Sequence, residues 1–76
     1  MSIMKKVIFS DEHKYLVGRL KQARKAVGLD QEKVAELLGV SQSYVSKVES
    51  GQRRIDIVQL KEFAKLYKKN ITFFIK

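Results

Sequence analysis

Two capped helical segments joined by a very short turn constrain this chain more than any other feature of its sequence. Residues 30–38, DQEKVAELL, begin with an aspartate suited to a helix N-cap and carry apolar residues at helical spacing. Residues 41–50, SQSYVSKVES, begin with a serine that can cap a second helix. Between them lie only Gly39 and Val40, and glycine readily adopts the left-handed conformation that ends a helix. Helices joined so tightly cross steeply, which predicts a helix-turn-helix over about residues 30–50.

The second of these segments has two unlike faces. Val45 and Val48 lie three residues apart and can hold one face against a core. The opposite face is polar. Glutamine and serine can reach base edges or phosphates, and lysine can reach guanine acceptors or phosphates. We therefore interpret the segment as a recognition helix that enters the major groove, and the side chains expected to project from it are Gln42, Ser43, Ser46 and Lys47.

The charge of the chain favours a polyanionic partner. Among 76 residues, 16 are Lys or Arg and 8 are Asp or Glu, which gives a net charge of +8. Such an excess is typical of proteins that bind nucleic acid or an anionic membrane surface, although solubility alone is the other explanation. A membrane is the weaker choice, because no helical segment combines a continuous basic stripe with bulky apolar anchors. No apolar run approaches the roughly 20 residues of a membrane span, and no signal-peptide cleavage site follows MSIMKKVIFS, so we expect a cytoplasmic protein.

Two further helices are predicted to flank the motif. The first runs from about Asp11 and carries acidic residues in its first turn and basic residues in its last turns, as the helix dipole favours. The second begins near Asp56, another good N-cap. The apolar stripes expected to face the core are Leu16, Leu20, Ala23 and Val27 in the first helix, and Leu60, Phe63, Ala64 and Tyr67 in the second.

The two ends of the chain have a different composition. Residues 3–9 and 71–75 are short, β-branched and aromatic, which predicts strands. A lone strand leaves its backbone groups unpaired, so these strands pair either with each other or with their copies in a second chain. We thus expect an all-α fold with short terminal β-strands. Its parts are an N-terminal arm over 1–10, a helix-turn-helix domain over 11–69 and a strand-like segment over 70–76.

Several residues around the predicted turn form a recognisable combination. They are Gln31 and Ala35 at a spacing of four, Gly39, the pair Val40–Ser41, the block YVSKVESG and the following helix DIVQLKEFAKLY. On these residues, the region 16–67 resembles the phage-repressor and Cro-type helix-turn-helix family, also called the XRE family. The resemblance implies a repressor-like bundle of four or five helices, sequence-specific binding of duplex DNA and dimeric repression of transcription.

The resemblance also implies roles for the matching residues. Gln31 resembles a phosphate-contacting glutamine, which in related repressors can also brace the glutamine at the position of Gln42. Gln42, Ser43 and Lys47 match the base-reading positions. Positions that match backbone contacts or caps are Ser41, Ser46 and Ser50, and the basic loop after the recognition helix contributes Arg53 and Arg54 as phosphate contacts.

Three further positions carry structural expectations. Arg24 and Glu49 match a partly buried ion pair that joins the first helix to the end of the recognition helix. Tyr44 departs from the family, because several well-known repressors have a small residue there. We place Tyr44 among the expected DNA backbone contacts, where it would touch the sugar-phosphate backbone or a thymine methyl group. The alternative is that it covers the edge of the core.

The sequence gives no support for catalysis. His13 is the only histidine, and the chain contains no cysteine. No nucleophile–base pairing, metal-ligand spacing or glycine-rich phosphate loop is visible. We therefore expect no enzyme, no cofactor and no metal site.

Two functional classes remain. The first is a repressor that binds an inverted-repeat operator as a homodimer, with the terminal strands at the dimer interface. The second is an antitoxin-type interaction module that binds a toxin or other regulatory protein and also represses its own operon. An antitoxin of the usual kind would need a toxin-binding extension, and the sequence shows no disordered tail. The repressor is therefore the favoured interpretation.

Overall fold

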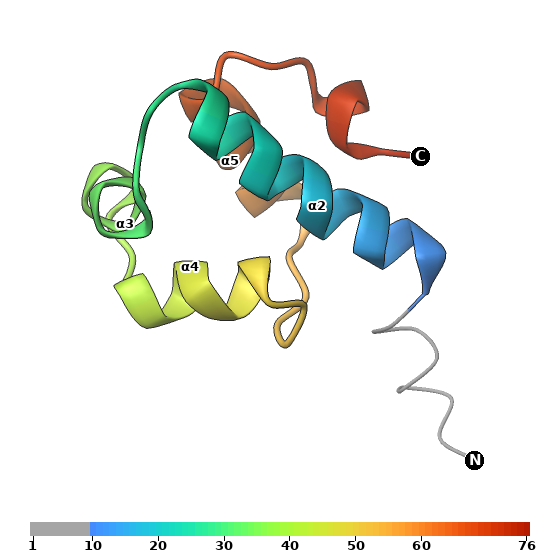
Figure 1. The fold of residues 1–76 in the computed structure, drawn as a ribbon, viewed down its shortest axis with the longest axis horizontal. Helices are drawn as coiled ribbons and strands as arrows, with labels where there is room; N and C mark the ends of the chain where they lie inside the picture. Colours follow the sequence, from blue (N-terminus) through green and yellow to red (C-terminus); the bar gives the residue numbers. More distant parts are fainter. Residues whose placement is uncertain (1–9) are drawn as a thin grey trace.

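The computed structural model describes residues 10–76, and this part of the chain is all α-helical. In Figure 1, α3 is seen nearly end-on while α4 lies across the view, so the two helices of the motif cross steeply as predicted. The expected helical bundle with a helix-turn-helix is therefore confirmed. Its elements are α2 (Asp11–Ala26), α3 (Gln31–Leu38), α4 (Gln42–Glu49), α5 (Ile57–Leu66) and a short 3-10 helix, η1 (Ile71–Phe74).

Local capping determines where the helices begin and end. Each α-helix begins after a serine or aspartate whose side chain accepts a hydrogen bond from a backbone N–H three residues further on. Gly39 ends α3 in the left-handed conformation, with φ 70°, and α4 begins almost at once. At the end of α5 no glycine is present, and Lys68 takes the left-handed conformation with φ 57°. The four N-caps are Ser10, Asp30, Ser41 and Asp56.

One hydrophobic core joins all these elements. Every residue of the predicted α5 stripe is buried, as are Val45 and Val48 of α4. Val27 was predicted to face the core, but it is 38% exposed. The reason is that α2 ends at Ala26, so helical periodicity no longer applies at Val27. The buried apolar residues are Leu20, Ala23, Val34, Ala35, Val45, Val48, Leu60, Phe63, Ala64, Tyr67 and Phe74.

The strand predicted at the C-terminal end is wrong, because this segment forms η1 instead. Asn70 Oδ1 accepts hydrogen bonds from both the backbone N–H and the hydroxyl of Thr72, each at 3.0 Å. This side-chain cap starts a tight turn, and the turn carries Phe74 into the core, where it is 1% exposed. Burial of an aromatic side chain outweighs the intrinsic β propensity of the segment.

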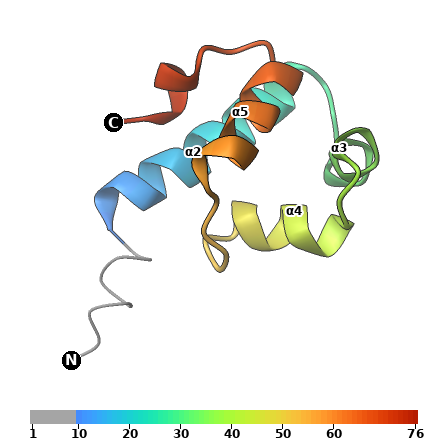
Figure 2. The ribbon, with the colours of Figure 1, turned by 180° about the vertical axis from the view of Figure 1, so that it is seen from behind.

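Helix α2 holds this C-terminal turn in place, and the two elements lie side by side in Figures 1 and 2. Arg19 Nε donates to the carbonyl of Phe73 at 2.9 Å, and its guanidinium lies 3.7 Å from the Phe73 ring centroid. Residues 10–76 contain no strand, so the predicted pairing has no C-terminal partner. The other predicted strand, over residues 3–9, lies outside the described residues.

Candidate nucleic-acid interface

One face of α4 is fixed to the core. Val45 is fully buried, and Val48 and Glu49 are 1% and 3% exposed. The Ser41 hydroxyl accepts from the Tyr44 N–H at 3.0 Å and fixes the start of the helix. The orientation of α4 about its own axis is therefore set by packing and by its cap.

The opposite face of α4 is polar and exposed. Gln42 and Ser46 are four residues apart, as are Ser43 and Lys47, so the four side chains share one side of the helix. All four are exposed. Helix α4 lies along one edge of the molecule in both ribbon views (Figures 1 and 2). The predicted base-reading residues are thus brought together on a rigid element at the surface.

A buried ion pair anchors the C-terminal end of α4. Arg24 Nε lies 2.7 Å from Glu49 Oε2, and Arg24 Nη2 lies 3.0 Å from Glu49 Oε1, which makes the pair bidentate. The third guanidinium nitrogen, Nη1, donates to the carbonyl of Leu29 at 2.9 Å. The hydrogen bonds to Glu49 raise the pKa of Arg24 above its ordinary value. Arg24 thereby joins α2, α4 and the loop before α3, which fixes their relative orientation.

Gln31 is part of the same network, a contact that sequence reasoning did not anticipate. Its Nε2 donates to Glu49 Oε1 at 3.0 Å, so its observed partner is Glu49 rather than Gln42. An amide NH₂ group has two donors, and the second remains for another acceptor. Gln31 is the first residue of α3, where free backbone N–H groups also favour an anion.

Tyr44 covers the core edge. Its ring stacks on Phe63, with centroids 6.5 Å apart and an interplanar angle of 25°. Its hydroxyl is buried and has no hydrogen-bond partner within residues 10–76, and burial raises the pKa of Tyr44. This geometry supports the interpretation that Tyr44 covers the edge of the core.

The loop after α4 is tied back to the helix. The carbonyl of Lys47 accepts from the Ser50 hydroxyl at 3.1 Å, from Gln52 N at 2.9 Å and from Arg53 N at 3.2 Å. Arg53 and Arg54 are both exposed at this loop. Two exposed cationic side chains thus follow α4 in a loop whose beginning is hydrogen-bonded to that helix.

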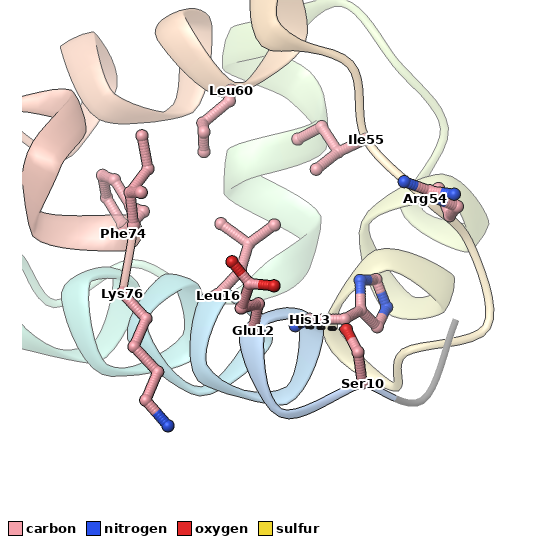
Figure 3. Close-up of a pocket in the computed structure, with 10 residues that line it drawn as sticks. Ser10, Glu12, His13, Leu16, Arg54, Ile55, Leu60, Phe74 and Lys76 are labelled. Atoms are coloured by element: carbon pink, nitrogen blue, oxygen red, sulfur yellow. Dashed lines mark hydrogen bonds between the residues drawn. The ribbon is translucent and has the colours of Figure 1, made fainter. Parts of the chain in front are cut away.

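A hollow of about 430 Å³ lies between the first turn of α2, the loop before α5 and the C-terminal residues (Figure 3). His13 is in its wall, with Nε2 3.4 Å from the carbonyl of Gly51, and among residues 10–76 Glu12 is the only acidic side chain in the lining. Within residues 10–76, no group of three or more His, Cys, Asp or Glu residues could hold a metal ion. None of the helices over that range is long and apolar enough to cross a membrane.

A recognition helix with an exposed polar face, a buried ion pair behind it and a basic loop after it defines a DNA-binding helix-turn-helix domain. Residues 20–74 match the helix-turn-helix family, and the chain belongs to this family of XRE-type DNA-binding transcription regulators, which are not enzymes.

The chain is also similar to a solved structure, the crystal structure of the restriction-modification controller protein C.AhdI from Aeromonas hydrophila. The sequence identity is 34% and the TM-score is 0.77. The alignment covers 88% of this chain and 100% of that chain. A comparison with curated protein sequences gives no significant match.

Proposed function

We propose that this protein is a repressor that recognises a specific duplex DNA sequence by inserting α4 into the major groove. The observation that carries the proposal is the division of α4 into a buried face and a polar face that is free to contact base edges. Gln42 and Lys47 are long enough to reach bases from a helix seated in the groove, and Ser43 stands beside them. The proposed base-reading residues are Gln42, Ser43 and Lys47.

Contacts to phosphates position the helix. Arg53 and Arg54 supply charge, and Gln31 has a spare amide donor at a helix N-terminus. Ser41 and Ser50 already act as caps, so their contribution to DNA is through the ends of α4 that they stabilise. We do not include Tyr44 among the proposed direct contacts to DNA, because its hydroxyl is buried. The proposed backbone contacts are Gln31, Ser41, Ser46, Ser50, Arg53 and Arg54.

We further propose a homodimer on an inverted-repeat operator, with an interface that does not depend on a C-terminal strand. Ile57 and Val58, at the start of α5, are 53% and 67% exposed and adjacent. Covering this apolar pair with its copy across a two-fold axis removes it from water. The same axis can bring two recognition helices to one face of the duplex, about 34 Å apart.

Sedimentation equilibrium tests this interface. The unmodified protein is expected to dimerise, and Val58→Lys is expected to be monomeric at the same concentration. A Lys21→Ala variant, which changes an exposed residue of α2, serves as the control. A monomeric unmodified protein at high micromolar concentration would remove the dimer from the proposal.

The likeness to C.AhdI suggests what is regulated. C.AhdI is a restriction-modification controller protein, and it shares 34% of its sequence with this chain over its whole length. On that likeness we propose that this protein controls genes of a restriction–modification system. Neighbouring genes for a methyltransferase and an endonuclease would support this assignment. A neighbouring toxin-like reading frame would instead favour the antitoxin alternative.

Selection of binding sites from a random duplex pool tests the function itself. The proposal expects a selected sequence with two-fold symmetry, bound far more tightly than a scrambled duplex of the same length and composition. Affinity should fall steeply with salt, because the protein displaces counterions from phosphates. Enrichment of no sequence above the starting pool would contradict sequence-specific regulation.

A further inference from the structure

An aromatic stack leads from the core to the basic loop. The rings of Tyr67 and Phe63 have centroids 5.9 Å apart and are tilted by 48°, and Tyr44 stacks on Phe63 with centroids 6.5 Å apart. The Arg53 guanidinium lies over the Tyr44 ring, with its central carbon 4.9 Å from the ring centroid. The loop cation therefore rests on a ring whose own position is fixed by the core.

The backbone of Arg53 is fixed to the same helix. Its N–H donates to the carbonyl of Lys47 at 3.2 Å, and Tyr44 stands one turn earlier on α4. Both the backbone and the guanidinium of Arg53 thus contact residues of the recognition helix. Arg54 differs, because it lines the hollow in Figure 3 and no ring within residues 10–76 stacks on it.

We propose that Tyr44 is a positioning residue that holds the Arg53 guanidinium ready for a DNA phosphate. This inference rests on the proposed function, because it assigns Arg53 to the DNA backbone. A guanidinium that lies over an aromatic ring can keep N–H groups at its edge free to donate to phosphate oxygens. An arginine that is already ordered loses less conformational freedom on binding than a free one.

The chemistry of Tyr44 agrees with this role. Its hydroxyl is buried and has no partner of good hydrogen-bond geometry within residues 10–76, although the nearby Arg53 opposes the effect of burial on the pKa of Tyr44. A phenylalanine offers the same ring without the unpartnered hydroxyl. A leucine fills part of the same space beside Phe63 but has no π face for a cation.

A double-mutant cycle on DNA binding tests the proposal in the full chain. Tyr44→Leu is expected to weaken binding about two- to fivefold, the range of an exposed cation–π contact. The same change in an Arg53→Ala background is expected to have no effect, whereas in an Arg54→Ala background it keeps its full effect. Tyr44→Phe should bind as the unmodified protein does. An equal loss in the Arg53→Ala background would mean that Tyr44 acts only through the fold, and would overturn the proposal.

A second measurement needs no DNA. In the free protein, the ring should shift the Arg53 side-chain NMR signals upfield, and this shift should persist in Tyr44→Phe and vanish in Tyr44→Leu. Random-coil Arg53 signals in the unmodified protein would overturn the positioning role even if DNA binding is strong. If the Arg53 signals show the upfield shift but the protein binds no DNA, the proposed function is overturned. The contact between Tyr44 and Arg53 would then exist without a role in phosphate binding.

Discussion

The two faces of α4 differ in burial and in the role that we assign to each. The inner face carries Val45, Val48 and Glu49, all buried, and these side chains are in contact with the rest of the fold. The outer face carries Gln42, Ser43 and Lys47, all exposed, and in residues 10–76 no element covers them. A helix of eight residues can thus be held firmly by one face and still keep its other face free for a ligand.

This division predicts that mutations separate cleanly into two groups. Changes on the inner face should alter the free energy of unfolding, and changes on the outer face should alter DNA binding at constant stability. A position at which a mutation changes both stability and DNA binding would contradict this division, because one side chain would then serve both purposes.

The largest expected effect is on stability, at Glu49. Glu49→Ala leaves the Arg24 guanidinium buried without its carboxylate, and should lower the free energy of unfolding by about 3–5 kcal/mol in urea denaturation. Glu49→Gln keeps some hydrogen bonds to Arg24 and should lose less. Glu62→Ala, an exposed acidic residue of α5, is the control and should change stability by less than about 0.5 kcal/mol. A Glu49→Ala variant as stable as this control would refute the anchoring role of the pair.

A comparable loss is expected far from α4, in the C-terminal turn. Phe74→Ala empties a site that is 1% exposed and should cost about 3–5 kcal/mol of stability. The neighbouring Ile75→Ala is a matched control, since Ile75 is 52% exposed. Folded Phe74→Ala should retain the sequence preference of the unmodified protein. A changed preference would show that the reading face depends on this end of the chain.

The loop should affect binding without affecting discrimination. The double change Arg53→Ala and Arg54→Ala is expected to weaken binding to selected and random duplexes alike. It should also reduce the steepness of the salt slope, the slope of log binding constant against log salt concentration, by about two. Lys21→Ala, on the exposed side of α2, should leave the slope unchanged. Retention of the full slope in the double variant would exclude both arginines as phosphate contacts.

The smallest expected effect compares two serines of α4. Ser41→Ala removes the cap on the Tyr44 N–H and should lower stability by about 1 kcal/mol. Ser43→Ala, two residues away, should leave the denaturation midpoint unchanged, because Ser43 is exposed and has no capping role. Equal stability of the two variants would contradict the capping role of Ser41.

The motif was predictable because its determinants are local. N-caps at Asp30, Ser41 and Asp56, and a left-handed glycine at Gly39, act within a few residues of themselves, and each occurs where the sequence indicates. The pairing of Arg24 with Glu49 came from the family resemblance, because nothing local joins residues so far apart.

The remaining features depend on tertiary contacts. The 71–75 segment has β-prone residues, yet Asn70 caps a turn there and the core accepts Phe74. The hydrogen bond from Gln31 to Glu49 and the stacking of Arg53 on Tyr44 likewise depend on how helices meet. Periodicity shows which residues face inward, but it does not show which partner each of them finds.

The most direct test of the account compares affinity for a selected operator with affinity for random duplex DNA. Gln42→Ala and Lys47→Ala are each expected to cost roughly 1–3 kcal/mol on the operator and much less on random DNA, because they remove base contacts. Their denaturation midpoints should match the unmodified protein, since both side chains are exposed. Equal losses on the two duplexes, or no loss on either, would contradict the claim that the outer face of α4 reads sequence.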